Sequence, residues 1–380
     1  MTLESANVEA HQAARGRPFR AIGYRMIDSI DIKNFRGFET FQIPNCGRVN
    51  IIVGENGVGK TALLEAIFLA LGSNSELTLR HRQSRGLEGS FQGAIRQIER
   101  ALWSDFFHNL DMNRTISIVL RGSGDEARSL FIARGVGETT LPLHEKPEEA
   151  SSLGQMVFTW IDANGEQHIA RPEIDNKGIR LTGTGEHLKD FFFYGASFVP
   201  PSIEAATRFS DLASTGGEVE FIEIFKEQFG WIDNLSIGVL AGAPVILATM
   251  RGRGIKLPVP ALSGAVNRMI SLFLAIATSP RSVVLVDEIE NGIHWTRHAG
   301  ITKALIAFAR KYETQLFVST HSKEWLNAVA DAVGDENDDI MLFRLERGPE
   351  GTSEIFQFSG DQMKAGIEYG AEIRGHSSTK

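Results

Sequence analysis

The sequence lacks several features that would place it in particular classes of protein. Among its 380 residues only Cys46 is a cysteine, so an intramolecular disulfide is excluded, and we interpret Cys46 as a buried thiol without a chemical role in a reducing compartment. No stretch approaches the ~18 consecutive apolar residues that a helix needs to cross a bilayer. These absences predict a cytoplasmic protein with no membrane contact.

Positive charge is also scarce. The chain has 39 lysines and arginines against 47 aspartates and glutamates, and its formal net charge of −8 argues against a surface that holds nucleic acid by bulk positive charge. The basic runs at 79–86 (LRHRQSRG) and 250–254 (MRGRG) fit solvated loops better than contacts to a phosphate backbone, so any DNA contact is expected to be local. The acidic run at 335–339 (DENDD) fits an exposed turn better than a metal site.

The apolar pattern divides the chain into parts of different character. Residues 1–22 lack an apolar signal core and are expected to form a flexible leader. Residues 23–72 and 191–330 alternate apolar strands with helical stretches, which predicts an α/β core with a mainly parallel sheet and an N-terminal antiparallel β subdomain. Residues 73–190 contain short alternating strands, which predict a β-rich insertion without an assigned role. Residues 331–380 predict two edge strands and a tail.

A glycine-rich loop follows the apolar strand VNIIVG and precedes a helix that is apolar on nearly every side. The loop, GENGVGKT, fits the pattern G-x-x-x-x-G-K-[ST] in the context of strand and helix that the pattern requires. Glycines let successive N–H groups turn toward a phosphate, and the positive end of the helix dipole adds to their effect. Lys60 would contact the β- and γ-phosphates, and the Thr61 hydroxyl would ligate Mg²⁺. The loop therefore predicts a phosphate site made by Gly54, Glu55, Asn56, Gly57, Val58, Gly59, Lys60 and Thr61.

Two further apolar strands end in polar residues that suit phosphoryl transfer. The segment SVVLVDEIE places Asp287 and Glu288 at the carboxyl end of a strand, where open α/β sheets bind ligands. Asp287 would hold Mg²⁺ through a water, and Glu288 would polarise the attacking water mainly by positioning it. The segment QLFVSTHS contains His321, whose imidazole is able to donate to the γ-phosphate. A structural hydrogen-bonding role is the alternative for His321.

Ser263 and Gly264 stand just ahead of the apolar helix that contains MISLFLAIA. Ser263 is expected to cap this helix by accepting a hydrogen bond from its first N–H groups. A serine and a glycine at a helix N-terminus also form an anion site. The two roles are compatible, so Ser263 is a candidate nucleotide-binding residue.

The order of four features along the chain resembles that in the heads of ABC-type ATPases. These features are the glycine-rich phosphate loop (P-loop), the LSG-x-x-x-R helix, the strand ending in DE and the strand ending in TH. Among these ATPases, the sequence resembles the branch of structural-maintenance-of-chromosomes proteins, RecF-like recombination ATPases and overcoming-lysogenization-defect nucleases. Neither the long coiled coil nor the C-terminal Toprim nuclease of some members is expected here, and the middle insertion matches no motif. The resemblance is carried by residues 26–71 and 191–326, in IDSIDIKNFRGFETFQI, VNIIVGENGVGKTALLEAI, VVLVDEIENGIH and LFVSTHS.

The resemblance implies roles that the residue pattern alone does not assign. Two heads would stack head to tail as an ATP-dependent homodimer, and Ser263 of each head would complete the nucleotide site of the other. In contrast to the usual signature, Gly264 follows Ser263 directly. Arg36 matches the arginine after the NF pair and would lie near the nucleotide phosphates, with a solvated turn arginine as the alternative. Gln83 is the candidate Q-loop residue, with a surface position as its alternative. The D-loop position is occupied by Glu290, Asn291, Gly292 and His294.

These inferences together predict a P-loop NTPase of α/β fold that binds ATP and Mg²⁺, dimerises around ATP and hydrolyses it. We expect the ATPase subunit of a prokaryotic DNA-maintenance or anti-phage defence system that acts with a separate nuclease or toxin effector. Two alternatives stay open. One is a nucleotide-gated switch that binds DNA or protein without hydrolysis, and the other is a nuclease site within 73–190.

Overall fold

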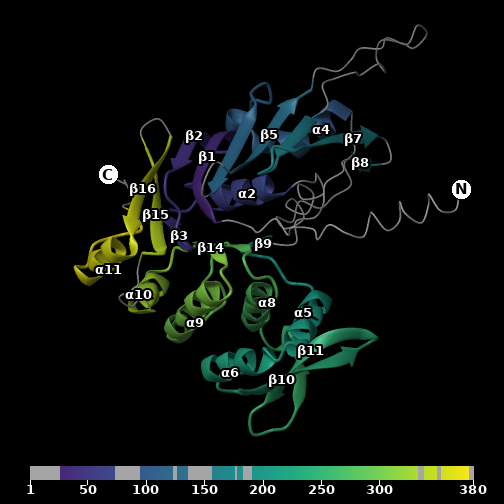
Figure 1. Cartoon of the computed structure of the whole chain (residues 1–380), viewed down its shortest axis with the longest axis vertical. Coiled ribbons are helices and arrows are strands. Elements are labelled where there is room, and N and C mark those ends of the chain that lie inside the picture. The colour runs from purple at the N-terminus through teal and green to yellow at the C-terminus, as the bar shows by residue number, and fades with distance from the viewer. Residues whose placement is uncertain are drawn as a thin grey trace, which may run out of the picture.

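Two large sheets with a helix between them organise the chain (Figure 1). The computed structural model describes residues 26–72, 95–122, 126–135, 156–175, 178–182, 191–332, 338–348 and 352–375. The expected leader, the candidate Q-loop residue Gln83 and the basic run at 79–86 lie outside the described residues. Among the described helices, none is long and apolar enough to cross a membrane.

The first sheet is antiparallel and has seven strands in the order β2-β1-β4-β5-β6-β7-β8. Strand β4 pairs with β1, so the strands of the segment 73–190 extend the N-terminal β subdomain instead of forming a sheet of their own. The segment also contributes helix α4 (Ile95–Trp103). The strands of this sheet are β1 (Ile27–Phe35), β2 (Phe38–Ile43), β4 (Ile116–Gly122), β5 (Ala127–Arg134), β6 (Met156–Ile161), β7 (Gln167–Asp175) and β8 (Gly178–Thr182).

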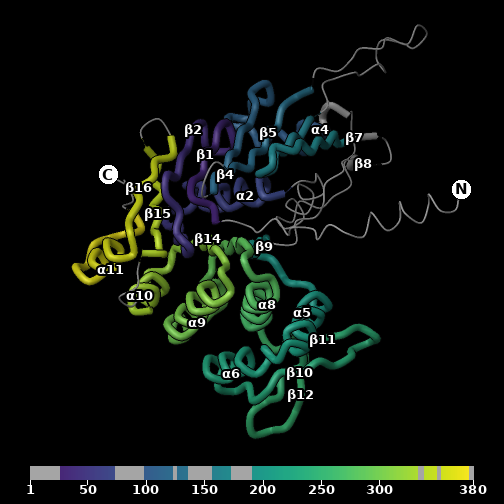
Figure 2. Tube along the Cα trace, in the orientation of Figure 1, coloured from purple at the N-terminus to yellow at the C-terminus, as the bar shows by residue number. Residues whose placement is uncertain are grey.

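The second sheet has six strands in the order β16-β15-β3-β14-β13-β9, all parallel except β16. Strand β15 pairs with β3 on one side and β16 on the other, so strands from opposite ends of the described chain lie side by side (Figure 2). The strands are β3 (Val49–Gly54), β9 (Phe191–Tyr194), β13 (Val283–Val286), β14 (Gln315–Ser319), β15 (Ile340–Arg347) and β16 (Ser353–Ser359).

The C-terminal part differs from its prediction in two respects. Only β16 is an edge strand, because β15 is interior to the sheet. The residues after β16, expected as a tail, form helix α11 (Gly360–Glu368), which begins with a capping box between Ser359 and Gln362. Strand β15 is interior because it pairs with β3, which is distant in the chain, and such pairing leaves no local sequence pattern. Helix α11 begins where Ser359 and Gln362 form a capping box, a sequence signal that the prediction of a tail left out.

Helix α2 (Lys60–Leu71) lies between the two sheets. It contacts β4 and β5 of the antiparallel sheet, and β3, β13 and β14 of the parallel sheet. Every residue of the helix after Thr61 is buried. A helix that is covered on all sides has no need of a polar face, which explains its mainly apolar sequence. Its one buried carboxylate, Glu65, pairs with Arg36.

The other face of the parallel sheet is covered by α8 (Gly264–Thr278), α9 (His298–Lys311) and α10 (Lys323–Ala332), as Figure 1 shows. Because successive strand residues point to opposite faces, Ile51 and Val53 of β3 join the core under these helices, while Ile52 joins the core around α2. The sheet is therefore buried on both faces, as its continuous apolar strands predict.

A smaller lobe precedes α8 in the chain. In Figure 1 it lies at the end of the molecule opposite the antiparallel sheet. It contains a three-stranded sheet in the order β10-β11-β12, with the helices α5 and α6 beside it. Its elements are α5 (Ser202–Ser214), α6 (Glu218–Gln228), β10 (Ile232–Leu240), β11 (Ala243–Met250), β12 (Lys256–Pro258) and α7 (Val259–Leu262).

Candidate functional site

The loop between β3 and α2 has a backbone that only glycine adopts easily. Gly54, Gly57 and Gly59 have φ values of 142°, 78° and 115°. A Cβ atom on Gly54 would lie 2.4 Å from the carbonyl oxygen of Leu345, and one on Gly59 would lie 2.9 Å from the Phe38 ring. The loop is thus confined between β15 and the antiparallel sheet, and its glycines are required by conformation and by space.

Lys60 is the first residue of α2, and its side chain folds back over the loop. Its Nζ donates to the carbonyl oxygens of Gly54 at 2.8 Å and Glu55 at 2.9 Å, and the residue is 8% exposed. Burial lowers the pKa of the Lys60 ammonium, and the carboxylates of Asp287 and Glu288 oppose that shift. A buried ammonium whose hydrogen bonds go to neutral carbonyl groups attracts an anion such as a phosphate.

Three elements meet at the carboxylate of Asp287, directly after β13. Thr61 Oγ1 on α2 donates to Asp287 Oδ2 at 2.8 Å, and Ser319 Oγ at the end of β14 donates to Asp287 Oδ1. Hydroxyl and carboxylate oxygens are the hard ligands that Mg²⁺ prefers, so the donor set fits this ion. The structure thus brings together Thr61 and Asp287, the two residues predicted to hold the metal.

Glu288 follows in an unusual backbone conformation. Its φ of 49° lies in the left-handed region, which is unfavourable for a residue with a side chain. The N–H of Glu288 donates to Ser319 Oγ at 2.9 Å, and its carbonyl oxygen accepts from Arg268 at 3.1 Å. Its charge also acts on the Lys60 ammonium. The predicted water-polarising residue therefore lies beside the predicted phosphate and metal ligands.

His321 lies at the start of the loop after β14 and pairs with Glu290. The His321 Nδ1 is 3.2 Å from Glu290 Oε1, and the backbone N–H of His321 donates to the same oxygen at 3.1 Å. The imidazole is 54% exposed, whereas the Glu290 side chain is 9% exposed. The carboxylate orients the ring, as expected for a structural hydrogen bond, and leaves the ring accessible. Contact between His321 and a γ-phosphate stays a prediction.

Ser263 has the predicted N-cap position of α8. Its side chain accepts a hydrogen bond from the N–H of Val266 at 3.4 Å. Gly264 is exposed, and a Cβ there would meet nothing within 4 Å. The N-terminus of α8 therefore presents an open surface, which is what a contact with a second head would require.

Arg36 lies in the turn between β1 and β2 and faces α2. Its Nε is 2.8 Å from Oε2 of the fully buried Glu65, and its guanidinium lies 5.6 Å and 5.5 Å from the ring centroids of Phe35 and Phe106. Only 13% of the side chain is exposed, so the alternative of a solvated turn arginine is not supported. Contact with a nucleotide phosphate stays a prediction.

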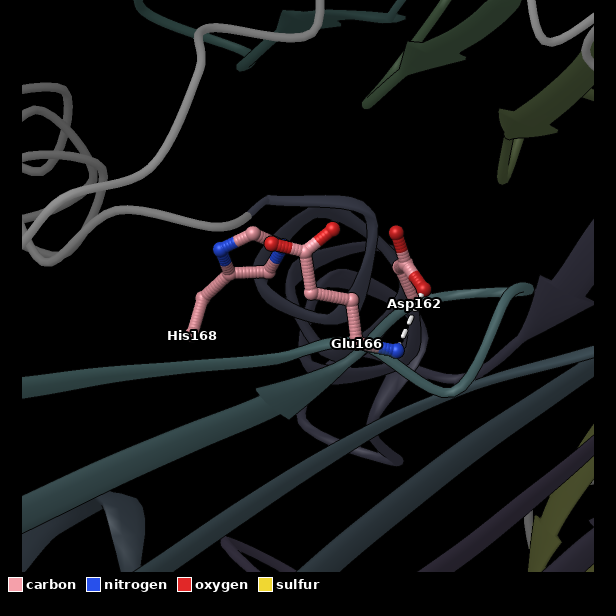
Figure 3. A group of neighbouring side chains, drawn as sticks. All are labelled: Asp162, Glu166 and His168. Carbon is pink, nitrogen blue, oxygen red and sulfur yellow. Dashed lines mark hydrogen bonds between the residues drawn. The ribbon is translucent and has the colours of Figure 1, made fainter.

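The other charged runs have ordinary surroundings where they are described. Asp339, the last residue of the acidic run, forms a two-pronged ion pair with Arg310, with bonds of 2.7 Å and 2.9 Å. In the run at 250–254, Met250 ends β11 and residues 251–254 form an exposed turn between β11 and β12. Two carboxylates and an imidazole, those of Asp162, Glu166 and His168, lie close together at the β6–β7 turn (Figure 3). There the Asp162 carboxylate accepts a hydrogen bond from the backbone N–H of Glu166 at 2.9 Å. This bond orders the turn and by itself points to no ligand.

Two residues of the site were not assigned a role from the sequence. Ser319 links Asp287 and Glu288, and Arg268, on α8, binds the backbone on which both acids stand. The signal for Arg268 was its place as the arginine of the LSG-x-x-x-R pattern, at the start of a long apolar helix. The sequence indicates only that Ser319 ends an apolar strand. Its role depends on contacts with Asp287 and Glu288, which follow the neighbouring strand β13.

A glycine loop between a parallel strand and a buried helix, with carboxylates two strands away beside its lysine, defines an ABC-type P-loop ATPase head. The chain matches the model of the RecF/RecN/SMC N-terminal domain family over residues 26–339, and it belongs to this family.

The chain is also similar to individual proteins. An "ATP/GTP phosphatase" of Helicobacter pylori is 24% identical over 346 residues, which cover 82% of this chain and 90% of that protein. The "DNA replication and repair protein RecF" of an Exiguobacterium species is 35% identical over 72 residues, 18% of this chain and 19% of RecF. An SMC head bound to the C-winged helix domain of ScpA is similar in structure over 88% of this chain and 98% of its own, with 13% identity and a TM-score of 0.49. The SMC head domain from Thermotoga maritima has 17% identity and a TM-score of 0.43, with 87% and 98% covered.

Proposed function

We propose that this chain is a Mg²⁺-dependent ATPase that dimerises around ATP and drives a DNA-maintenance or anti-phage defence system. The observation that carries the enzymatic part is the 2.8 Å hydrogen bond between Thr61 and Asp287. This bond joins the start of α2 to the end of β13, next to Lys60, as a shared site for metal and phosphate requires.

Each residue then has a task in hydrolysis. The loop N–H groups and Lys60 bind the phosphates, and Thr61 and Asp287 hold Mg²⁺, which would neutralise charge on the phosphate oxygens. The Glu288 carboxylate orients the attacking water and accepts its proton. Glu290 pairs with His321 and orients its imidazole. Because phosphoryl transfer has a loose transition state, positioning and electrostatics account for most of the catalysis.

Dimerisation is supported by the exposed N-terminus of α8. Ser263 and Gly264 would contact the triphosphate bound to a second copy, where the positive end of the helix dipole favours anions. ATP would then be bound by residues of both heads, and its hydrolysis would release them.

The link to DNA rests on relatives. RecF is named for DNA replication and repair, and the family joins RecF with SMC proteins. The net charge of −8 makes a local DNA contact or a protein partner the expected mode of action. A separate nuclease or toxin as effector rests on the resemblance to overcoming-lysogenization-defect proteins. Pull-down of partners with and without a non-hydrolysable ATP analogue tests this part.

Steady-state ATP turnover tests the enzymatic proposal. We expect phosphate release by the wild-type protein with Mg²⁺, background release with EDTA, and background release by Lys60→Ala, which lacks the charge on the β- and γ-phosphates. Lys311→Ala removes an exposed lysine that pairs with Glu220 and serves as the control with unchanged turnover. Equal rates for the wild type and Lys60→Ala would disprove ATP hydrolysis at this site. Tight ATP binding without turnover would favour the nucleotide-gated switch.

Light scattering tests dimerisation. Glu288→Gln keeps the shape of the side chain but is expected to lower turnover by about 100-fold or more, so ATP-bound dimers should accumulate. Adding Lys60→Ala to this variant should return it to monomers. Monomeric Glu288→Gln in saturating ATP would contradict the dimer.

A further inference from the structure

Arg268 is a buried charge that binds main-chain carbonyl groups rather than a carboxylate. The residue is 4% exposed, and burial lowers the pKa of its guanidinium. Its Nη1 donates to the carbonyl oxygen of Glu288 at 3.1 Å, and its Nη2 donates to the carbonyl oxygens of Asp287 and, at 3.2 Å, Tyr194. Burying a cation is costly, so this arrangement calls for a reason beyond packing.

Two of the three carbonyls that Arg268 binds, those of Asp287 and Glu288, flank the Cα of the strained residue Glu288. The peptide unit before the Cα of Glu288 is held at both ends: Arg268 binds the Asp287 oxygen, and Ser319 Oγ accepts the Glu288 N–H. The following peptide unit is held through the Glu288 oxygen. A residue with a φ of 49° keeps that conformation only when its surroundings enforce it. Arg268 and Ser319 supply that enforcement together with the Asn291 N–H, which donates to the Glu288 carbonyl oxygen at 3.0 Å.

We propose that Arg268 is a positioning residue, which locks the backbone of Glu288 in the left-handed conformation that aims its carboxylate at the bound nucleotide. This inference rests on the proposed ATPase function. Without the guanidinium, Glu288 relaxes toward ordinary backbone angles and its carboxylate moves away from the attacking water. A displacement of the carboxylate by about 1 Å is enough to lower turnover, and it leaves the phosphate contacts of the loop and Lys60 unchanged.

The same contact links two parts of the proposed mechanism. Arg268 and Ser263 lie on one helix, and the first turn of that helix also packs on the loop after Glu288, where a Cβ on Gly292 would lie 3.1 Å from the Cβ of Ala265. A rigid helix transmits a shift of its N-terminus to Arg268. Glu288 is therefore set in place by the helix that contacts the second head in the proposed dimer.

The test compares Arg268→Ala and Arg268→Lys with the wild type in kcat and in the Kd for ATP. The alanine variant is expected to lose about 10- to 100-fold in kcat while its Kd for ATP stays unchanged, because Lys60 and the glycine loop are untouched. Lysine keeps the charge but cannot reach the separate carbonyls together, so an intermediate loss is expected. Guanidinium chloride at non-denaturing concentration should restore part of the activity of the alanine variant.

Two comparisons separate positioning from general packing. Arg208 donates to Thr278 Oγ1 at 2.9 Å, at the other end of the same helix, so Arg208→Ala should keep its kcat. The double variant Arg268→Ala, Glu288→Gln should turn over no more slowly than Glu288→Gln alone, because both changes remove the same function.

Several outcomes would overturn the inference. A folded Arg268→Lys or Arg268→Ala variant with full kcat would do so. Parallel losses of kcat, ATP affinity and thermal stability without rescue by guanidinium would also do so, since they indicate a structural role. If Lys60→Ala abolishes turnover while the Arg268 variants retain it, only the inference fails. If the wild type has no turnover above Lys60→Ala, the proposed function fails together with the inference.

Discussion

At the scale of the residue, the phosphate loop depends on two features: glycines that lack a side chain, and the buried ammonium of Lys60. Because Gly54 and Gly59 have no Cβ atom, the loop fits against Leu345 and Phe38. The absence of side chains also lets a phosphate come close to the loop backbone. The hydrogen bonds from Lys60 to two carbonyl groups offset part of the free-energy cost of burying its ammonium. A bound phosphate would replace these weak partners with a charged one, so nucleotide binding should stabilise the fold.

Thermal unfolding with and without Mg-ATP tests this view of the loop. At about 100 times its Kd, ATP should add about 2.7 kcal/mol to the stability of the wild type. Gly59→Ala should gain nothing, because its new methyl group would meet the Phe38 ring and disturb the loop. Gly165 also has a positive φ, 79° against 115° for Gly59, but nothing lies within 4 Å of a Cβ there, so Gly165→Ala should keep the full gain. An undiminished gain in Gly59→Ala would contradict the assignment of the loop.

At the scale of the element, α8 and the loop after β13 form one unit. Gly292 has a φ of 77° and packs against Ala265 in the first turn of the helix, while Arg268 binds the start of the same loop. Within the loop, the Asn291 N–H donates to the Glu288 carbonyl oxygen at 3.0 Å and the Ile293 N–H donates to the Glu290 carbonyl oxygen at 2.9 Å. The contacts with the helix add to these turns and fix the loop against α8.

A pair of glycine substitutions measures this packing. Gly292→Ala and Gly252→Ala both place a side chain at positive φ, 77° and 74°, which costs about 1–2 kcal/mol in each case. Nothing lies within 4 Å of a Cβ at Gly252, whereas the one at Gly292 would lie 3.1 Å from Ala265. We therefore expect Gly292→Ala to be the less stable variant in urea unfolding and to have the lower ATP turnover. Equal stability and equal turnover would show that the contact is unimportant.

At the scale of the whole molecule, a buried amide joins the two sheets. Gln315, at the start of β14 and fully buried, accepts the N–H of Ile27 in β1 at 2.8 Å. Its Nε2 donates to the carbonyl oxygens of Ile27 and Gly47, both at 2.8 Å. Together with α2, this side chain fixes how the antiparallel sheet lies on the parallel one.

Replacing this amide tests its contribution to global stability. Gln315→Leu leaves three buried backbone groups without these bonds and should lower the free energy of unfolding by about 3 kcal/mol or more. Gln357→Leu removes an exposed bond to the carbonyl oxygen of Asn45 and should cost about 0.5 kcal/mol or less. Urea unfolding of both variants gives the comparison, and similar small losses for both would refute the role of Gln315.

The α/β P-loop fold with an N-terminal antiparallel sheet was predicted from the sequence and is confirmed, whereas the roles of the site residues stay predictions. The P-loop, Asp287, Glu288, His321 and Ser263 were proposed from residue types at fixed spacing and at strand and helix ends, and Arg36 was added by resemblance. Helix α11 and the interior position of β15 were missed. Pairing between strands that are far apart in the chain leaves no local pattern, so the extension of the N-terminal sheet by the segment 73–190 was missed for the same reason.

The sequence by itself determined where the phosphate loop, the buried helix and the acidic strand end lie, because backbone freedom, charge and apolar runs are local properties of the chain. Only the tertiary structure decided that Ser319 and Arg268 hold the two acids and that Gln315 joins the sheets. These contacts connect residues from different strands and helices. A hydrogen bond depends on distance and direction in space, and neither is written in the order of the residues.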